Sequence, residues 1–134
     1  MNVLIAVTEP DHMHHASALK WFTTPEMDWG WCAFSEAGFL RASTNPNVGK
    51  HSVEEATVVL TDLARRPGYR FWPVNHSWAD LVGPFQNRVY GHQQITDAYL
   101  LGIAIKGNGV LVSFDKAMRT LAGPRFSAHI LILE

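Results

Sequence analysis

The chain has 134 residues and a formal net charge of −1, because 11 lysine and arginine residues stand against 12 aspartate and glutamate residues. A chain of this length corresponds to one domain with a sizeable core. Hydrophobic residues make up 47% of the chain and charged residues 17%, which excludes an intrinsically disordered protein, and the near-neutral charge gives no general attraction to nucleic acid.

Predicted helices and strands alternate along the chain. Residues 2–7 (NVLIAV) are ambiguous, because their β-branched side chains favour a strand but six residues are too few to decide. The elements that follow are, in order, a helix over 14–24, a strand over 30–35, helices over 36–44 and 53–64, a strand over 69–74, helices over 77–81 and 96–106, a strand over 109–114, a short helix over 115–122 and a strand over 128–133. Strands separated by helical segments of ten or more residues indicate an α/β domain with a mainly parallel sheet.

Local signals support several of these boundaries. Ser52 and Glu55 have the S-x-x-E spacing of a capping box, and Ser77 is placed to cap the short helix behind it. The continuous apolar run over 109–114 is typical of a parallel strand that is covered on both faces. The apolar faces expected to be buried comprise Ala18, Leu19 and Phe22 in one helix, and Val53, Ala56, Leu60, Leu63 and Ala64 in another.

Three acidic residues occupy corresponding places in this pattern. Glu36 and Asp115 follow strands, and Asp97 opens an apolar helix behind Thr96. Each acid taken alone is most simply a cap or a first-turn residue that stabilises the positive end of a helix. The carboxyl ends of parallel strands share one edge of a sheet, where ligands bind, so the three carboxylates together also predict a site for Mg²⁺ or Mn²⁺.

Longer segments around these acids resemble a known family. The segments NVLIAVTEPDHMHHASALKWF, FSEAGFLRASTNP and GHQQITDAYLLGIA, the strand GVLVSFD and the final strand together span nearly the whole chain. They resemble the PIN-domain ribonucleases of the VapC type, the toxins of type II toxin–antitoxin pairs. The resemblance implies a single domain over 1–134, folded as a three-layer α/β/α sandwich around a five-stranded parallel sheet. It also implies four acids that hold Mg²⁺ and direct a water molecule at an RNA phosphodiester.

The resemblance places the family's acids on three positions of this sequence. Glu36 matches the acid after the second strand, Asp97 the acid of the TDAYLL helix, and Asp115 the acid at the end of the strand that ends in a sequence like TFD. Asn2 matches the small polar residue beside the first acid, and Arg41 and Thr96 are candidate substrate contacts, with a backbone contact and a helix cap as the ordinary alternatives. A homodimer, a cognate antitoxin and an RNA substrate are the implied partners.

The sequence departs from the family at its beginning. Family members start with an apolar strand that ends in Asp, whereas here Met1 stands directly before NVLIAV, which by the same alignment is the first helix. We therefore expect the central strand and its Asp to be missing, as would follow from translation starting at a late GTG codon. An alternative function is a truncated, catalytically impaired PIN domain that binds antitoxin or RNA without cleaving it.

The remaining signals concern compartment and aromatic residues. The start of the chain lacks the basic region of a signal peptide, no apolar run approaches the ~18 residues of a membrane span, and a lone Cys32 excludes an intramolecular disulfide. We therefore expect a cytoplasmic protein without a membrane segment. The aromatic residues that flank the strands have three interpretations, as core, as dimer surface or as platforms for RNA bases; they are Trp29, Trp31, Phe34, Phe71 and Trp72.

Overall fold

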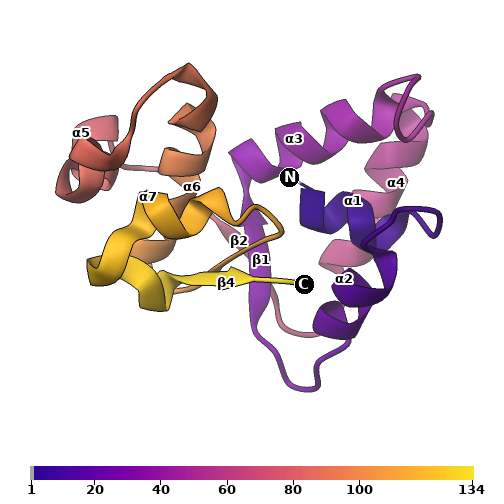
Figure 1. The fold of residues 1–134 in the computed structure, drawn as a ribbon. Coiled ribbons are helices and arrows are strands. Elements are labelled where there is room, and N and C mark those ends of the chain that lie inside the picture. Colours follow the sequence, from indigo (N-terminus) through magenta and orange to yellow (C-terminus); the bar gives the residue numbers. More distant parts are fainter. Residues whose placement is uncertain (1) are drawn as a thin grey trace. The chain divides into compact units, whose positions relative to one another are not determined.

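The computed structural model describes residues 2–134, and of Asn2 only the backbone. The described chain forms two compact units, the first ending at Pro73 and the second covering Val74–Glu134. The elements of the first unit are α1 (Asn2–Thr8), α2 (His15–Phe22), β1 (Trp29–Cys32), α3 (Ala33–Thr44), α4 (Val53–Ala64) and β2 (Tyr69–Trp72). In Figure 1 they run from indigo to magenta and pink.

Helix α1 is buried on every side. The five residues from Val3 to Val7 are each at most 8% exposed, and the helix packs against α2 and α3. The hydroxyl of Thr8 donates a hydrogen bond to the carbonyl of Leu4 at 3.0 Å. The helix expected here from the family resemblance is confirmed, and the β-branched residues that favour a strand are overridden by burial within the unit.

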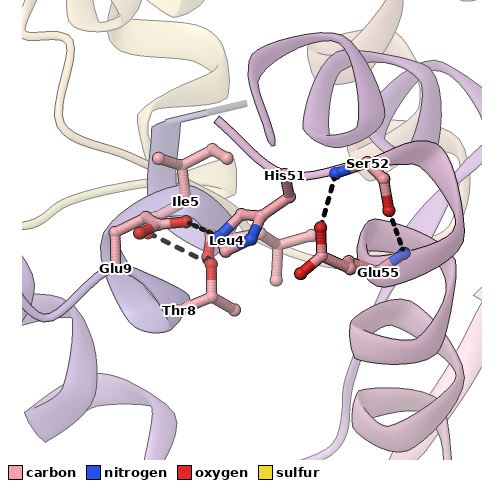
Figure 2. Close-up of polar contacts among 7 residues, drawn as sticks. All are labelled: Leu4, Ile5, Thr8, Glu9, His51, Ser52 and Glu55. Atoms are coloured by element: carbon pink, nitrogen blue, oxygen red, sulfur yellow. Dashed lines mark hydrogen bonds and ion pairs between the residues drawn. The ribbon is translucent and has the colours of Figure 1, made fainter. Parts of the chain in front are cut away.

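One polar contact joins the end of α1 to the start of α4, beside the cap of α4 (Figure 2). His51 Nε2 lies 2.9 Å from Glu9 Oε1, and His51 directly precedes the α4 cap. At that cap the Ser52 hydroxyl accepts the Glu55 N–H at 3.0 Å, and the Glu55 carboxylate accepts the Ser52 N–H at 2.9 Å. The predicted capping box is therefore confirmed, and the His51–Glu9 pair holds it against the N-terminal helix.

The strands β1 and β2 form a parallel pair with Trp29 opposite Tyr69 and Cys32 opposite Trp72. Their aromatic rings form a cluster: Trp31 lies 4.7 Å from Tyr69 and 5.7 Å from Trp29, measured between ring centroids. Trp29 in turn meets Phe22 of α2 edge-on at 4.8 Å. We call Phe22, Trp29, Trp31 and Tyr69 the aromatic cluster; it packs the two-stranded sheet against α2.

The second unit has its own parallel sheet. Its elements are α5 (Trp78–Val82), the short 3₁₀ helices η1 (Gly83–Arg88) and η2 (His92–Gln94), α6 (Ile95–Lys106), β3 (Leu111–Ser113), α7 (Ala117–Phe126), η3 (Ser127–His129) and β4 (Ile130–Ile132). Strand β3 pairs with β4, with Leu111 opposite Ile130. Helix α6 supplies the centre of this unit, since Ala98 and Leu101 are fully buried and Ile103 is 9% exposed.

Two glycines allow close packing in the second unit. Gly102 of α6 lies against Leu81 of α5, and a Cβ atom at Gly102 would come within 2.7 Å of the Leu81 carbonyl oxygen. Gly123 has a φ of +64° and interrupts α7 just before Pro124. This left-handed residue and the proline explain why α7 is bent after Ala122, where the predicted helix over 115–122 ends.

The predicted fold class is confirmed as mixed α/β with parallel strands, but some details differ. The predicted buried faces are wrong at Leu19, which is 40% exposed, and at Val53, which is 66% exposed because it is the first residue of α4. Strand β3 is only half-buried, so it is not covered on both faces as its apolar run predicted. None of the helices described in residues 2–134 has the length and apolar character that a membrane crossing requires.

Candidate active site

Asp97 and Asp115 are both held at element boundaries in the second unit. Asp97 stands in the first turn of α6 and is half-buried. Asp115 follows β3 in an exposed turn, where its N–H donates to the Ser113 hydroxyl at 3.0 Å. Its Oδ1 accepts the N–H of Ala117 at 2.9 Å, which fixes the carboxylate at the start of α7. The predicted helix start at Asp115 is wrong by two residues, because α7 begins at Ala117 and Asp115 stands before it, bonded to its first N–H.

The charge of Asp115 acts on the carboxylate of Asp97. Burial raises the pKa of Asp97, and the negative charge of Asp115 raises it further. A carboxylate that is both partly desolvated and close to a second one carries an electrostatic cost at neutral pH. A cation bound between them removes that cost, so this pair has the charge arrangement of a cation ligand set.

Glu36 belongs to the first unit, in the first turn of α3 directly after β1. Its Oε2 accepts the indole N–H of Trp31 at 2.9 Å. Tyr69 lies on the same side of the sheet: burial raises the pKa of its hydroxyl, and the negative charge of Glu36 raises it further. The carboxylate therefore stands at the rim of the aromatic cluster, half-buried and bonded to one of its members.

The three remaining candidates have different surroundings. Arg41 is exposed in the last turn of α3, and Thr96 is exposed in the first turn of α6. The interpretation of Thr96 as a helix cap is wrong, because α6 begins one residue earlier and Gln94 is at the cap position, so its hydroxyl lies inside the first turn. The side chain of Asn2 lies outside the described residues.

These acids fit a hard divalent cation in chemistry. Carboxylate oxygens are the ligands that Mg²⁺ and Mn²⁺ prefer, and a bound cation would offset the negative charge of Asp115 that raises the pKa of Asp97. Among the residues that the structure describes, no group of three or more His, Cys, Asp or Glu side chains is close enough to hold a metal ion. Of the three acids expected as metal ligands, Asp97 and Asp115 belong to the second unit and Glu36 belongs to the first.

Sequence reasoning missed the role of Trp31 beside Glu36. It left this residue as core, dimer surface or base platform, but the side chain is only 4% exposed and bonds a candidate ligand. Its burial excludes stacking on an RNA base, as does the 9% exposure of Trp29. Phe34 and Phe71 are 37% and 43% exposed, so they keep enough surface for a contact. The available signal was the spacing of a Trp and a Glu across a strand-to-helix junction.

The chain is similar to several bacterial ribonucleases. It is 38% identical over 136 residues to Ribonuclease VapC38 of Mycobacterium tuberculosis (strain ATCC 25618 / H37Rv), with 99% of this chain and 94% of that protein covered. It is 36% identical to Ribonuclease VapC39 of the CDC 1551 / Oshkosh strain, over 88% of this chain and 87% of that protein. For Ribonuclease VapC44 of the same strain the identity is 32%, over 92% and 89%. No protein-family model matches the chain.

Proposed function

The chain belongs to the VapC family of ribonucleases, and from this membership we propose that it is the toxin of a toxin–antitoxin pair, an endoribonuclease that hydrolyses RNA phosphodiester bonds with the help of Mg²⁺. The observation that carries this function is identity of up to 38% to named VapC ribonucleases over nearly the whole chain. Further support comes from Asp97, whose pKa is raised by burial and by the negative charge of Asp115, so that a cation at this place would be favoured.

In this proposal Asp97, Asp115 and Glu36 hold the ion. A bound Mg²⁺ supplies Lewis acidity, which activates water for attack and offsets the charge of the phosphate oxygens. The protein contributes fixed carboxylates: Asp115 is held by its bond to the Ala117 N–H, and Glu36 by its bond to Trp31. Mn²⁺ has the same oxygen preference and is the expected substitute.

Three further residues are proposed to meet the RNA. Arg41 is an exposed cation on α3, the helix that carries Glu36, and a guanidinium is suited to a phosphate group. Thr96 presents an exposed hydroxyl next to Asp97. Asn2 is proposed by its match to the family pattern alone.

The finer features of the fold also stand as proposals. We propose a single PIN-like domain over 1–134 with a three-layer arrangement, completed by a central strand that carries the fourth acid. Support comes from the sheets, since in the described residues each consists of only two parallel strands, and two-stranded sheets have little stability on their own. A homodimer, a cognate antitoxin and a location in the cytoplasm are proposed from the family resemblance.

The test is cleavage of a structured RNA by the purified chain in Mg²⁺, beside Asp97→Asn and the control Asp80→Asn. Asp80 is also a first-turn acid of a helix in the second unit, and its side chain is exposed. We expect Asp80→Asn to keep the cleavage rate of the unsubstituted protein, and Asp97→Asn to lose at least about 100-fold in rate relative to it. Metal-dependent cleavage that survives Asp97→Asn would overturn the site.

A second form of the protein tests the missing acid. The same assay is run on a chain extended upstream by the codons that precede Met1. Cleavage by the extended chain alone would support the proposed strand and its Asp. If neither form cleaves but the chain still binds RNA or an antitoxin, the non-cleaving function is the correct one.

A further inference from the structure

The bond between Trp31 and Glu36 joins the aromatic cluster to a proposed metal ligand. Trp31 Nε1 donates to Glu36 Oε2 at 2.9 Å, from the third residue of β1 to the first turn of α3. The indole group has one N–H and no acceptor, so this bond uses its whole hydrogen-bonding capacity. No other hydrogen bond to the Glu36 carboxylate is found in the described part of the chain, which leaves Oε1 for another partner.

The indole ring itself has little freedom to move. Trp31 is 4% exposed, and its ring packs against Tyr69 at 4.7 Å and against Trp29 at 5.7 Å. A buried ring fixed by two neighbours presents its N–H in one direction. A hydrogen bond to a charged acceptor is stronger than one between neutral groups, so the rotation of the carboxylate is restricted by a rigid donor.

Trp29 shows what a purely structural tryptophan looks like in the same place. It is two residues earlier on the same strand, is 9% exposed and belongs to the same aromatic cluster. Its indole N–H donates to the backbone carbonyl of Pro67 at 3.1 Å, away from any acid. The two residues thus differ chiefly in the acceptor of the indole N–H.

We propose that Trp31 is a positioning residue of the ribonuclease: by binding Oε2 it restricts the Glu36 carboxylate so that Oε1 remains for a divalent cation. This inference rests on the proposed role of Glu36 as a ligand. Groups behind a metal ligand that fix its orientation change metal affinity by about 10–100-fold when removed. Trp31 would have this effect without touching the ion or the RNA.

The test compares Trp31→Phe with Trp29→Phe, since each keeps a large ring and removes one indole N–H. Mn²⁺ binding is measured from the decrease of the free-ion electron paramagnetic resonance signal. We expect Trp31→Phe to raise the Mn²⁺ dissociation constant by about 10-fold or more and Trp29→Phe to change it by less than about threefold. In a Glu36→Gln background the difference between the two substitutions should disappear.

A second measurement keeps both tryptophans and so does not depend on how the two Phe variants fold. The indole ¹H–¹⁵N resonance of Trp31 should shift in Glu36→Gln, because the acceptor loses its charge, while the Trp29 resonance stays in place. An unmoved Trp31 resonance, or equal weakening of Mn²⁺ binding by both Phe substitutions, would overturn the inference and leave the proposed function intact. Mn²⁺ binding that is unchanged in Glu36→Gln would instead remove Glu36 from the proposed site, and Trp31 with it.

Discussion

Replacing Gly102 with alanine tests the packing that holds the Asp97 helix. The new Cβ would lie 2.7 Å from both the Cβ and the carbonyl oxygen of Leu81, about 0.7 Å closer than the 3.4 Å at which ordinary contact begins. Leu81 is 3% exposed and one of the offending atoms is backbone, so neither α5 nor α6 can relax cheaply. Overpacking of this kind costs about 3 kcal/mol at the upper end of its range. Alanine regains about 1 kcal/mol of helix propensity, which leaves a net loss of about 2 kcal/mol.

Gly83 provides the matched control. It has helical dihedral angles at the end of α5, and a Cβ there would meet no atom within 4 Å. Gly83→Ala should therefore be neutral or stabilise the protein by up to about 1 kcal/mol. Urea denaturation followed by circular dichroism gives both values, and for Gly102→Ala the net loss corresponds to a fall in melting temperature of roughly 6–10 °C.

The same variant has a functional consequence. Gly102 is five residues after Asp97 on α6, so a displaced helix moves the carboxylate. We expect RNA cleavage to fall further than the folded fraction alone explains. A Gly102→Ala protein as stable as the unsubstituted chain, or a Gly83→Ala protein that is equally destabilised, would refute the packing of α5 against α6 on which the reasoning depends.

The remaining predictions concern Asp97 and the α4 cap. The raised pKa of Asp97 means that the folded protein holds this proton more tightly than the unfolded chain, so stability is lost as the pH rises from the ordinary carboxyl value of about 3.9 through the raised one. Without metal, Asp97→Asn should be the more stable protein in urea at pH 7, with the difference vanishing in strong acid; a difference independent of pH would contradict this. Mg²⁺ should raise the melting temperature of the unsubstituted chain and have less effect on Asp97→Asn. Ser52→Ala should lower the free energy of unfolding by about 1 kcal/mol, whereas Thr57→Ala, on the exposed part of the same helix, should change it less.

The positions of most helices followed from local signals. The predicted caps are confirmed: Ser52 caps α4 together with Glu55, and Ser77 caps α5. They were predictable because the hydrogen bonds of a cap join residues that are close in the sequence. Residues 2–7 did not reveal their helix by pattern, since apolar residues on every side give no period when the helix is buried all round. The helix over these residues was predicted only from the family resemblance.

The acidic residues of the candidate site could be predicted from the sequence, but the contacts that orient their side chains could not. The acids were singled out by their places after strands and at helix starts, and their role as metal ligands stays a prediction; the charge of Asp115 does raise the pKa of Asp97. The bond from Trp31 to Glu36 was not predictable, because it depends on how an indole ring is turned within the aromatic cluster. The exposure of Leu19 shows the same limit, since an apolar helical stripe does not say how much of it the neighbours cover.

The pairing of the strands has a consequence for the order in which the chain folds. Trp29 pairs with Tyr69, 40 residues later, whereas Leu111 pairs with Ile130 after only 19 residues. Closing the longer loop costs about 0.7 kcal/mol more in chain entropy, and distant contacts also form more slowly. During synthesis, strand β1 therefore cannot pair with β2 until about forty further residues have been added to the chain. Until Tyr69 has emerged from the ribosome, the Trp31 ring, whose N–H donates to Glu36, lacks the Tyr69 ring that it packs against in the folded protein.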